Sequence, residues 1–221
     1  MKKISILLFV LINTNLLAQQ KNNYAEIGGG IGASSGSFGA ALHKNWTLGK
    51  NNKFVIGTGL RFTSFFGTDI NFITAPADLT SDPKNLDTLL APKPSLSSLN
   101  AMINLGYRLN KKIEFGFNID ALGLSYGPTG SPSYITNGKS TVVSAKPTSL
   151  NLLLVGDRDK GSLNSHLYAK YDISNKIGLK LAYQFLFNEL TTSTKVQTVP
   201  SDNDRFRVKS SMVFVGVSYG F

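Results

Sequence analysis

Apolar and polar residues alternate with a period of two over eight stretches of the chain. In one stretch Ile177, Leu179 and Leu181 share one face, while Gly178 and Lys180 lie on the other. This alternation is typical of a β-strand with one apolar and one polar face. Each stretch approaches or exceeds the ~9–11 residues that a tilted membrane strand requires. The predicted strands are 24–33, 37–48, 53–66, 97–109, 112–125, 163–173, 176–188 and 206–221.

Short and long connections alternate between these strands. Tight turns rich in Asn and Gly fall at 49–52, 110–111 and 174–175, and such residues tolerate the positive φ that hairpin turns need. The long connections are 67–96, 126–162 and 189–205. Outer-membrane barrels show this alternation, with short periplasmic turns and longer external loops. The sequence therefore predicts an all-β fold, an eight-stranded antiparallel up-and-down transmembrane β-barrel.

Aromatic residues recur near the ends of alternate predicted strands, always on the apolar face. We expect them to form one girdle at the periplasmic interface, where amphipathic rings are favoured. They are Trp46, Tyr107, Tyr171 and Tyr219. Lys44 shares the apolar face with Trp46, although a lysine at mid-membrane costs roughly 2–4 kcal/mol. We expect its ammonium group to snorkel to the interface, or a local bulge to displace it.

The polar faces carry charged residues of both signs. The interior of an eight-stranded barrel is only wide enough for side chains to fill it. We therefore expect these residues to neutralise one another in a packed polar lumen with no open pore. A narrow, porin-like channel for small solutes is the alternative. The predicted lumen network is Glu26, Arg61, Arg108, Glu114, Asp120, His166, Lys170, Asp172 and Lys180.

Candidate catalytic and metal-binding residues are few. The chain has no cysteine, which excludes disulfides, thiolate metal sites and thiol catalysis. Ser165 and His166 are adjacent, so they point to opposite faces of a strand and cannot form a dyad. We predict no catalytic residue, no metal and no cofactor. A lipid-modifying barrel enzyme that uses His166 or His43 is the enzymatic alternative.

An apolar run at 149–155 interrupts the second long connection. An exposed loop tip would not favour such a run, so we expect it to extend a strand or to pack over the barrel mouth. Capping the lumen or binding a partner is the functional alternative. A ten-stranded barrel that uses 134–143 and 150–156 is a further alternative, although neither segment has a clean apolar face.

The N-terminal residues predict export. Residues 1–3 are positively charged, 4–12 are apolar but too short to span a bilayer, and Ala18 precedes a suitable cleavage point. We expect residues 1–18 to be a signal peptide and 19–221 to be the barrel domain; a retained membrane anchor is the alternative. The formal charge of +10 comes from scattered lysines without a basic helix. We therefore expect anionic lipid headgroups as partners and no nucleic acid.

The chain ends on an alternating strand whose last residue is Phe221. This ending resembles the C-terminal strand of outer-membrane barrels, which typically finish on an aromatic residue. Phe221 is therefore expected to act as an assembly signal that the barrel-assembly machinery recognises during insertion.

Four segments of the chain carry a family resemblance: 18–20, 115–120, 151–161 and 219–221. Through them the whole chain resembles the Bacteroidetes-type family of porin-like outer-membrane β-barrel proteins. The resemblance implies a place in the bacterial outer membrane and contact with its lipids, including lipopolysaccharide. It implies a structural or interaction role through a loop-rich external surface, leaves the external ligand open and assigns no catalytic residue.

Overall fold

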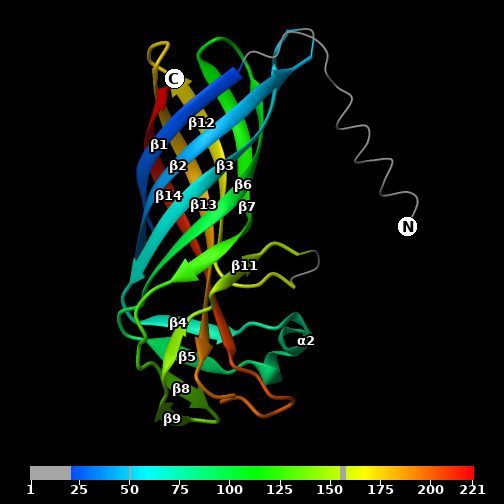
Figure 1. Cartoon of the computed structure of the whole chain (residues 1–221). Helices are drawn as coiled ribbons and strands as arrows, with labels where there is room; N and C mark the ends of the chain where they lie inside the picture. Colours follow the sequence, from blue (N-terminus) through cyan, green and yellow to red (C-terminus); the bar gives the residue numbers. More distant parts are fainter. Residues whose placement is uncertain (1–20, 50, 155–157) are drawn as a thin grey trace, which may run out of the picture.

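Eight long antiparallel strands form a closed barrel (Figure 1). The computed structural model describes residues 21–49, 51–154 and 158–221, so the expected signal peptide lies outside the described residues. The first strand pairs with both the second and the last, which closes the sheet and confirms the predicted eight-stranded barrel. In order around the barrel, the strands are β1 (Lys21–Ile31), β2 (Ser35–Leu48), β3 (Phe54–Gly67), β6 (Ser95–Arg108), β7 (Ile113–Tyr126), β12 (Leu163–Asp172), β13 (Ile177–Thr192) and β14 (Arg205–Gly220).

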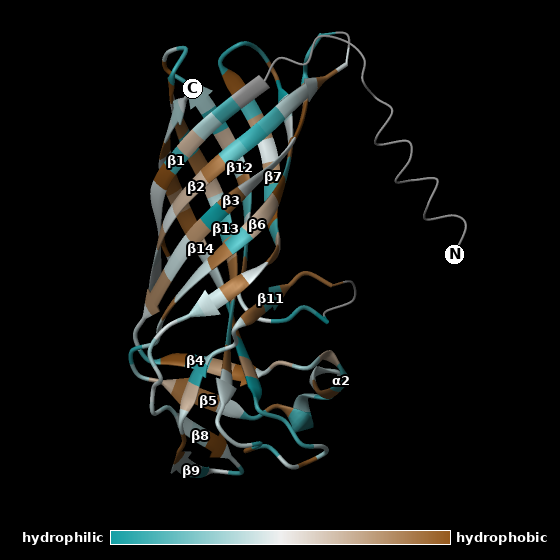
Figure 2. Cartoon of the chain, viewed as in Figure 1, coloured by the Kyte–Doolittle hydropathy of each residue, from teal (hydrophilic) through white to brown (hydrophobic). Residues whose placement is uncertain are grey.

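The alternation in sequence becomes an apolar outer wall and a polar interior. Hydrophobic and hydrophilic residues alternate along the barrel strands in Figure 2. Leu181 and Val215, a directly opposed pair, each expose 57% of their surface on the outside. Lys180 and Gly216, the next pair, point inward and are buried. A wall of this kind fits a surround of hydrocarbon, in which backbone groups must pair within the protein.

The strand boundaries move little from the predicted ones. The largest shift is at the end of β13, which reaches Thr192 instead of residue 188. The apolar phase of β7 slips after Ala121, and the pairing with β6 gives the reason. Asp120 pairs with Met102 and Leu122 with Ala101, so Ala121 is the extra residue of a β-bulge. The bulge restores the apolar outer face beyond it.

The barrel has two unlike ends. At the turn end lie the three tight turns that follow β2, β6 and β12. At the loop end, the long connections contain five further strands in place of the loops predicted. They join the barrel sheet, because β13 and β14 extend beyond the barrel and offer edges for pairing (Figure 1). They are β4 (Ile70–Thr74), β5 (Thr88–Ala91), β8 (Ser133–Thr136), β9 (Lys139–Val142) and β10 (Ala145–Pro147).

These five strands, together with the extended parts of β13 and β14, are called the cap. Its order runs from β10 through β13, β14, β4, β5 and β8 to β9. A bridge between Gly130 and Ala145 ties the start of the β8 hairpin back to β10. Two short helices, α2 (Ala77–Thr80) and the 3-10 helix η1 (Pro83–Asn85), join β4 to β5. Among the described residues, no helix is long and apolar enough to cross a membrane.

The apolar run at 149–155 contributes a short strand. β11 (Leu150–Leu152) pairs with Leu122–Leu124 of β7, beyond the part of β7 that pairs with β12. The ten-stranded alternative is therefore wrong, because β11 pairs only with β7 and residues 133–142 form a hairpin in the cap. Residues 155–157 lie outside the described part of the chain.

The main hydrophobic core lies at the loop end. It runs from the interior of the barrel into the cap, and its largest members are fully buried phenylalanines. The barrel contributes Phe65, Leu96, Leu186 and Met212, and the cap contributes Phe72, Leu89, Tyr134, Leu190 and Phe206. The inward face of β13 thus carries Lys180 and Gln184 in the lumen and Leu186 and Leu190 in this core, with buried Asn188 between the two leucines.

Candidate functional site

Two ion pairs cross the middle of the lumen. The ammonium group of Lys180 on β13 lies 2.9 Å from the Glu26 carboxylate on β1, and both side chains are buried. The His43 ring lies 3.8 Å from the same carboxylate and stacks on Tyr24. Because β14 separates β1 from β13, the Glu26–Lys180 contact connects strands that are not hydrogen-bonded to each other.

Arg61 and Asp120 form the second and more extensively bonded pair. The Arg61 Nε and Nη2 atoms donate to Asp120 Oδ1 at 2.9 and 2.6 Å. Asp120 Oδ2 accepts from the Asn100 side chain at 2.7 Å and from the Asn164 backbone at 3.0 Å. Arg61 also donates to the Asn118 side chain at 2.6 Å. A buried ion pair is tolerated when further hydrogen bonds satisfy both charges, as they do here.

Two further pairs lie nearer the turn end. Arg108 and Glu114 are 3.2 Å apart, and Glu114 also accepts a hydrogen bond from Tyr168 at 2.9 Å. Lys170 and Asp172 are 2.8 Å apart. Eight of the nine predicted lumen residues therefore lie in four ion pairs. His166, the ninth, is buried against Phe214 at a centroid distance of 4.6 Å.

The two histidines offer little for catalysis. His43 and His166 expose 3% and 1% of their surface and face the interior, so a lipid outside the barrel does not reach either ring. The Ser165 hydroxyl donates to the Phe185 carbonyl at 3.3 Å and is not bonded to His166. Among the described residues, there is no cluster of three side chains suited to a metal ion.

A buried carboxylate, Glu189, lies at the loop end and is not among the predicted lumen residues. Glu189 is fully buried and accepts from Arg205 at 2.8 and 2.9 Å and from Arg207 at 2.8 Å. Both arginines also donate to the backbone carbonyl of Asp159. The cluster therefore ties the chain after β11 to β13 and β14. The alternation of β13 breaks at Glu189 and Leu190, so the sequence predicts a loop at 189–205 where the structure has the end of β13.

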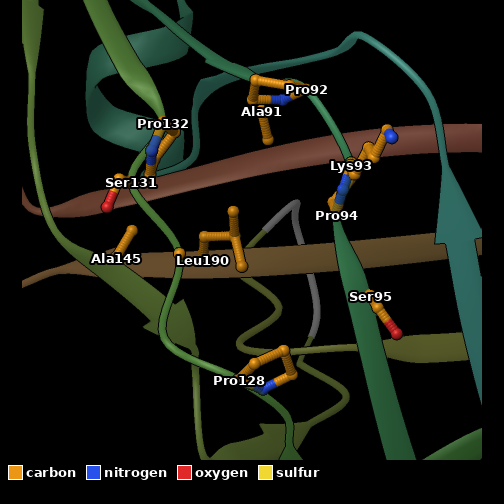
Figure 3. Close-up of a pocket in the computed structure, with 11 residues that line it drawn as sticks. Ala91, Pro92, Lys93, Pro94, Ser95, Pro128, Ser131, Pro132, Ala145 and Leu190 are labelled. Atoms are coloured by element: carbon orange, nitrogen blue, oxygen red, sulfur yellow. The ribbon is translucent and has the colours of Figure 1, made fainter.

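The cap carries a pocket of ≈ 220 Å³ beside its core. Pro92 and Pro94 precede β6, Pro128 and Pro132 precede β8, and Leu190 lies opposite them (Figure 3). The Ser95, Ser131 and Lys93 side chains also line it. Proline rings present carbon atoms and no backbone donor. The lining of the pocket is therefore mostly apolar.

Tyr134 joins the cap sheet to the chain between η1 and β5. Its hydroxyl donates to Asp87 Oδ2 at 2.5 Å, and its ring packs on Phe206. Burial, together with the carboxylate of Asp87, raises the pKa of Tyr134 to about 12. The phenol therefore stays neutral at physiological pH and keeps this hydrogen bond.

The predicted aromatic girdle lies on the outer wall at the turn end. Tyr107, Tyr171 and Tyr219 are exposed there, and Trp46 is half-buried. Phe221 is exposed at the same end, and its backbone N–H donates to the Asn23 carbonyl at 3.1 Å. Its role as an assembly signal stays a prediction.

Comparisons with known proteins identify structures of similar fold but do not assign the chain to a family. No protein-family model matches the chain, and no curated protein matches it. Several solved structures are similar in fold. Neisserial surface protein A (NspA) is 11% identical with a TM-score of 0.42, and the match covers 93% of this chain and 100% of that one.

The attachment invasion locus protein Ail of Yersinia pestis is 12% identical with a TM-score of 0.40, over 91% of this chain and 99% of that one. The N-terminal β-barrel domain of Pseudomonas aeruginosa OprF is 11% identical with a TM-score of 0.38, over 92% and 100%. Likenesses at this level concern the fold alone, and the expected Bacteroidetes-type family stays a prediction.

The Arg61–Asp120 pair gives a testable prediction. Asp120→Ala leaves a buried guanidinium without its counter-charge, and we expect it to lower the free energy of unfolding by about 3–5 kcal/mol. Arg61→Met with Asp120→Leu removes both charges, so we expect a much smaller loss than the sum of the losses in Arg61→Met alone and Asp120→Leu alone. Urea unfolding in lipid vesicles measures the free energy of unfolding of all four variants.

The exposed pair Lys195–Asp202, 3.5 Å apart, is the matched control. Its double-mutant cycle should give a coupling below about 1 kcal/mol. If the losses in free energy of unfolding at Arg61 and Asp120 add up in the double variant, the two side chains are not coupled in the lumen.

Proposed function

We propose that this chain is a non-enzymatic outer-membrane protein, in which the barrel is a closed membrane anchor and the cap is an interaction module. The observation that carries the proposal is the hydrophobic core that begins inside the barrel at the loop end and continues into the cap. A polar lumen packed with ion pairs leads into a hydrophobic core that includes Phe65, Leu186 and Phe206. Such a core would block an open aqueous passage, whereas a folded external module is stabilised by a hydrophobic core.

The outer wall supports the membrane part of the proposal. Residues such as Leu181, Val215 and Leu105 expose apolar side chains around the barrel, and a soluble monomer rarely exposes an apolar surface of this extent. The aromatic girdle marks one edge of this apolar band. Outer-membrane lipids, lipopolysaccharide among them, would surround the band, and the barrel-assembly machinery would insert it.

The cap supports the interaction part. It presents the Pro-lined pocket near Lys93 and an exposed edge strand, β9, to the surroundings. Both features lie away from the lipid-facing wall. We propose that the external partner binds to the cap, and the proline-lined pocket favours a small apolar group of that partner.

Topology is the first test, and the lack of cysteine in the chain makes it direct. Ser140→Cys places a thiol on exposed β9, and Asn175→Cys places one in the exposed turn before β13. We expect a membrane-impermeant maleimide to label Ser140→Cys in intact cells and Asn175→Cys only after the cells are opened. Labelling in the reverse order, or of both sites in intact cells, would contradict the proposed orientation.

Conductance is the second test, because it separates a closed anchor from a narrow channel. We expect the purified chain, inserted in a planar bilayer, to give no steady single-channel steps, since side chains fill the lumen and the core covers its loop end. A porin reconstituted in the same way shows that the assay detects channels. Steady steps from this chain would replace the closed anchor with the channel alternative.

A further inference from the structure

A hollow of ≈ 450 Å³ opens on the lipid-facing wall of the barrel. It lies where short side chains interrupt the wall, over Thr58 of β3 and Ala101 of β6. Leu42 and Leu60 border it. These two leucines are directly opposed on β2 and β3, and Ala101 is the partner of Leu60 on β6. The hollow is therefore a mostly apolar groove over three neighbouring strands, and Asn23 of β1 and Phe221 also line it.

A charged side chain also lines this hollow. Lys44 is the partner of Thr58 across β2 and β3 and is exposed on the outer wall. Its Nζ atom lies 5.7 Å from the Trp46 ring centroid. Among the described residues, no carboxylate forms an ion pair with Lys44 and no acceptor takes a hydrogen bond from it. The ammonium group thus keeps three donors next to an apolar groove.

Lysine and aromatic residues meet at three other places on the same end of the barrel. Lys53 lies 5.8 Å from the Tyr107 ring, Lys112 lies 6.0 Å from Tyr171, and Lys176 lies 5.8 Å from Tyr219. Each of these lysines immediately precedes a strand. The girdle is therefore also a ring of positive charge, at the level where lipid phosphates lie.

A second hollow on the wall shows what is special about the first. It has ≈ 370 Å³ and lies over Ala169 between Tyr171, Leu181 and Val215. The two lysines that reach it, Lys170 and Lys180, belong to the ion pairs of the lumen. Of these two hollows, only the first combines a groove with a free ammonium group.

We propose that the hollow beside Lys44 binds one anionic phospholipid, with its phosphate at the Lys44 ammonium group and an acyl chain in the groove over Thr58 and Ala101. The proposal rests on the proposed membrane location. A lysine on a lipid-facing wall needs a counter-charge or access to water. A phosphate at the interface supplies the counter-charge, and the groove adds apolar contact along the chain that hangs from it.

Trp46 makes the proposal measurable, because it is the only tryptophan and lies two residues from Lys44. The full chain is reconstituted in phosphatidylcholine vesicles that contain an equal fraction of either brominated phosphatidylglycerol or brominated phosphatidylcholine. Bromine quenches a neighbouring tryptophan. We expect brominated phosphatidylglycerol to bind near Trp46 about fivefold more favourably, in line with one lysine at a lipid surface.

Three variants give the controls. Lys44→Gln removes the charge and should abolish the preference. Ala101→Leu fills the groove but keeps the charge, and it should also reduce the preference. Lys176→Gln removes a lysine from the same end of the barrel but away from the hollow, and it should leave the preference unchanged.

The outcomes separate this proposal from the one it rests on. If neither brominated lipid quenches Trp46, the turn end does not lie in a bilayer and the proposed function fails. If both lipids quench Trp46 equally in the unchanged chain, the lipid site alone is wrong. A preference that survives Lys44→Gln or Ala101→Leu, or that is lost in Lys176→Gln, would show attraction by the whole ring of lysines and would also overturn the site.

Discussion

The pairing of β1 with β14 is the constraint on which the rest of the structure depends. In hydrocarbon, an unpaired backbone N–H or carbonyl costs several kcal/mol, so a sheet in a membrane must have no free edge. Eight residues of β1, from Tyr24 to Ile31, meet eight residues of β14 in register. This pairing fixes the number of strands, and the number of strands fixes a lumen narrow enough for side chains from opposite walls to meet.

The narrow lumen explains how so many charges are buried. Lys180 reaches Glu26 past β14, and Arg61 reaches Asp120 past β6. In a wider barrel these groups would stay in water and the lumen would conduct. Toward the loop end, the hydrophobic core that the barrel shares with the cap lies beside the buried Glu189 cluster. The paired strands β13 and β14 are continuous from the barrel into the cap, so they line the lumen and also contribute to the core of the cap.

The barrel could be predicted from the sequence because strand alternation is a local property. The same alternation predicts which residues face the lumen, but it does not predict which of them form ion pairs with one another. A period of two gives the face of Lys180 and says nothing about a carboxylate 154 positions away in the chain. The cap was missed because strands of three to five residues, such as β10 and β4, carry too few alternations to stand out. Glu189 was missed because Glu189 and Leu190 are both buried, which breaks the pattern.

Cross-linking of the closing seam tests the closed barrel most directly. Ile27 and Val217 are directly opposed on β1 and β14, and opposed residues of antiparallel strands lie within the Cα distance of a disulfide. Ile27→Cys with Val217→Cys should form a disulfide that changes the mobility of the unfolded chain on a gel. Ile27→Cys with Ser218→Cys, whose side chains point to opposite faces, should not. Failure of the first pair to cross-link, or equal cross-linking of both, would contradict a barrel closed in this register.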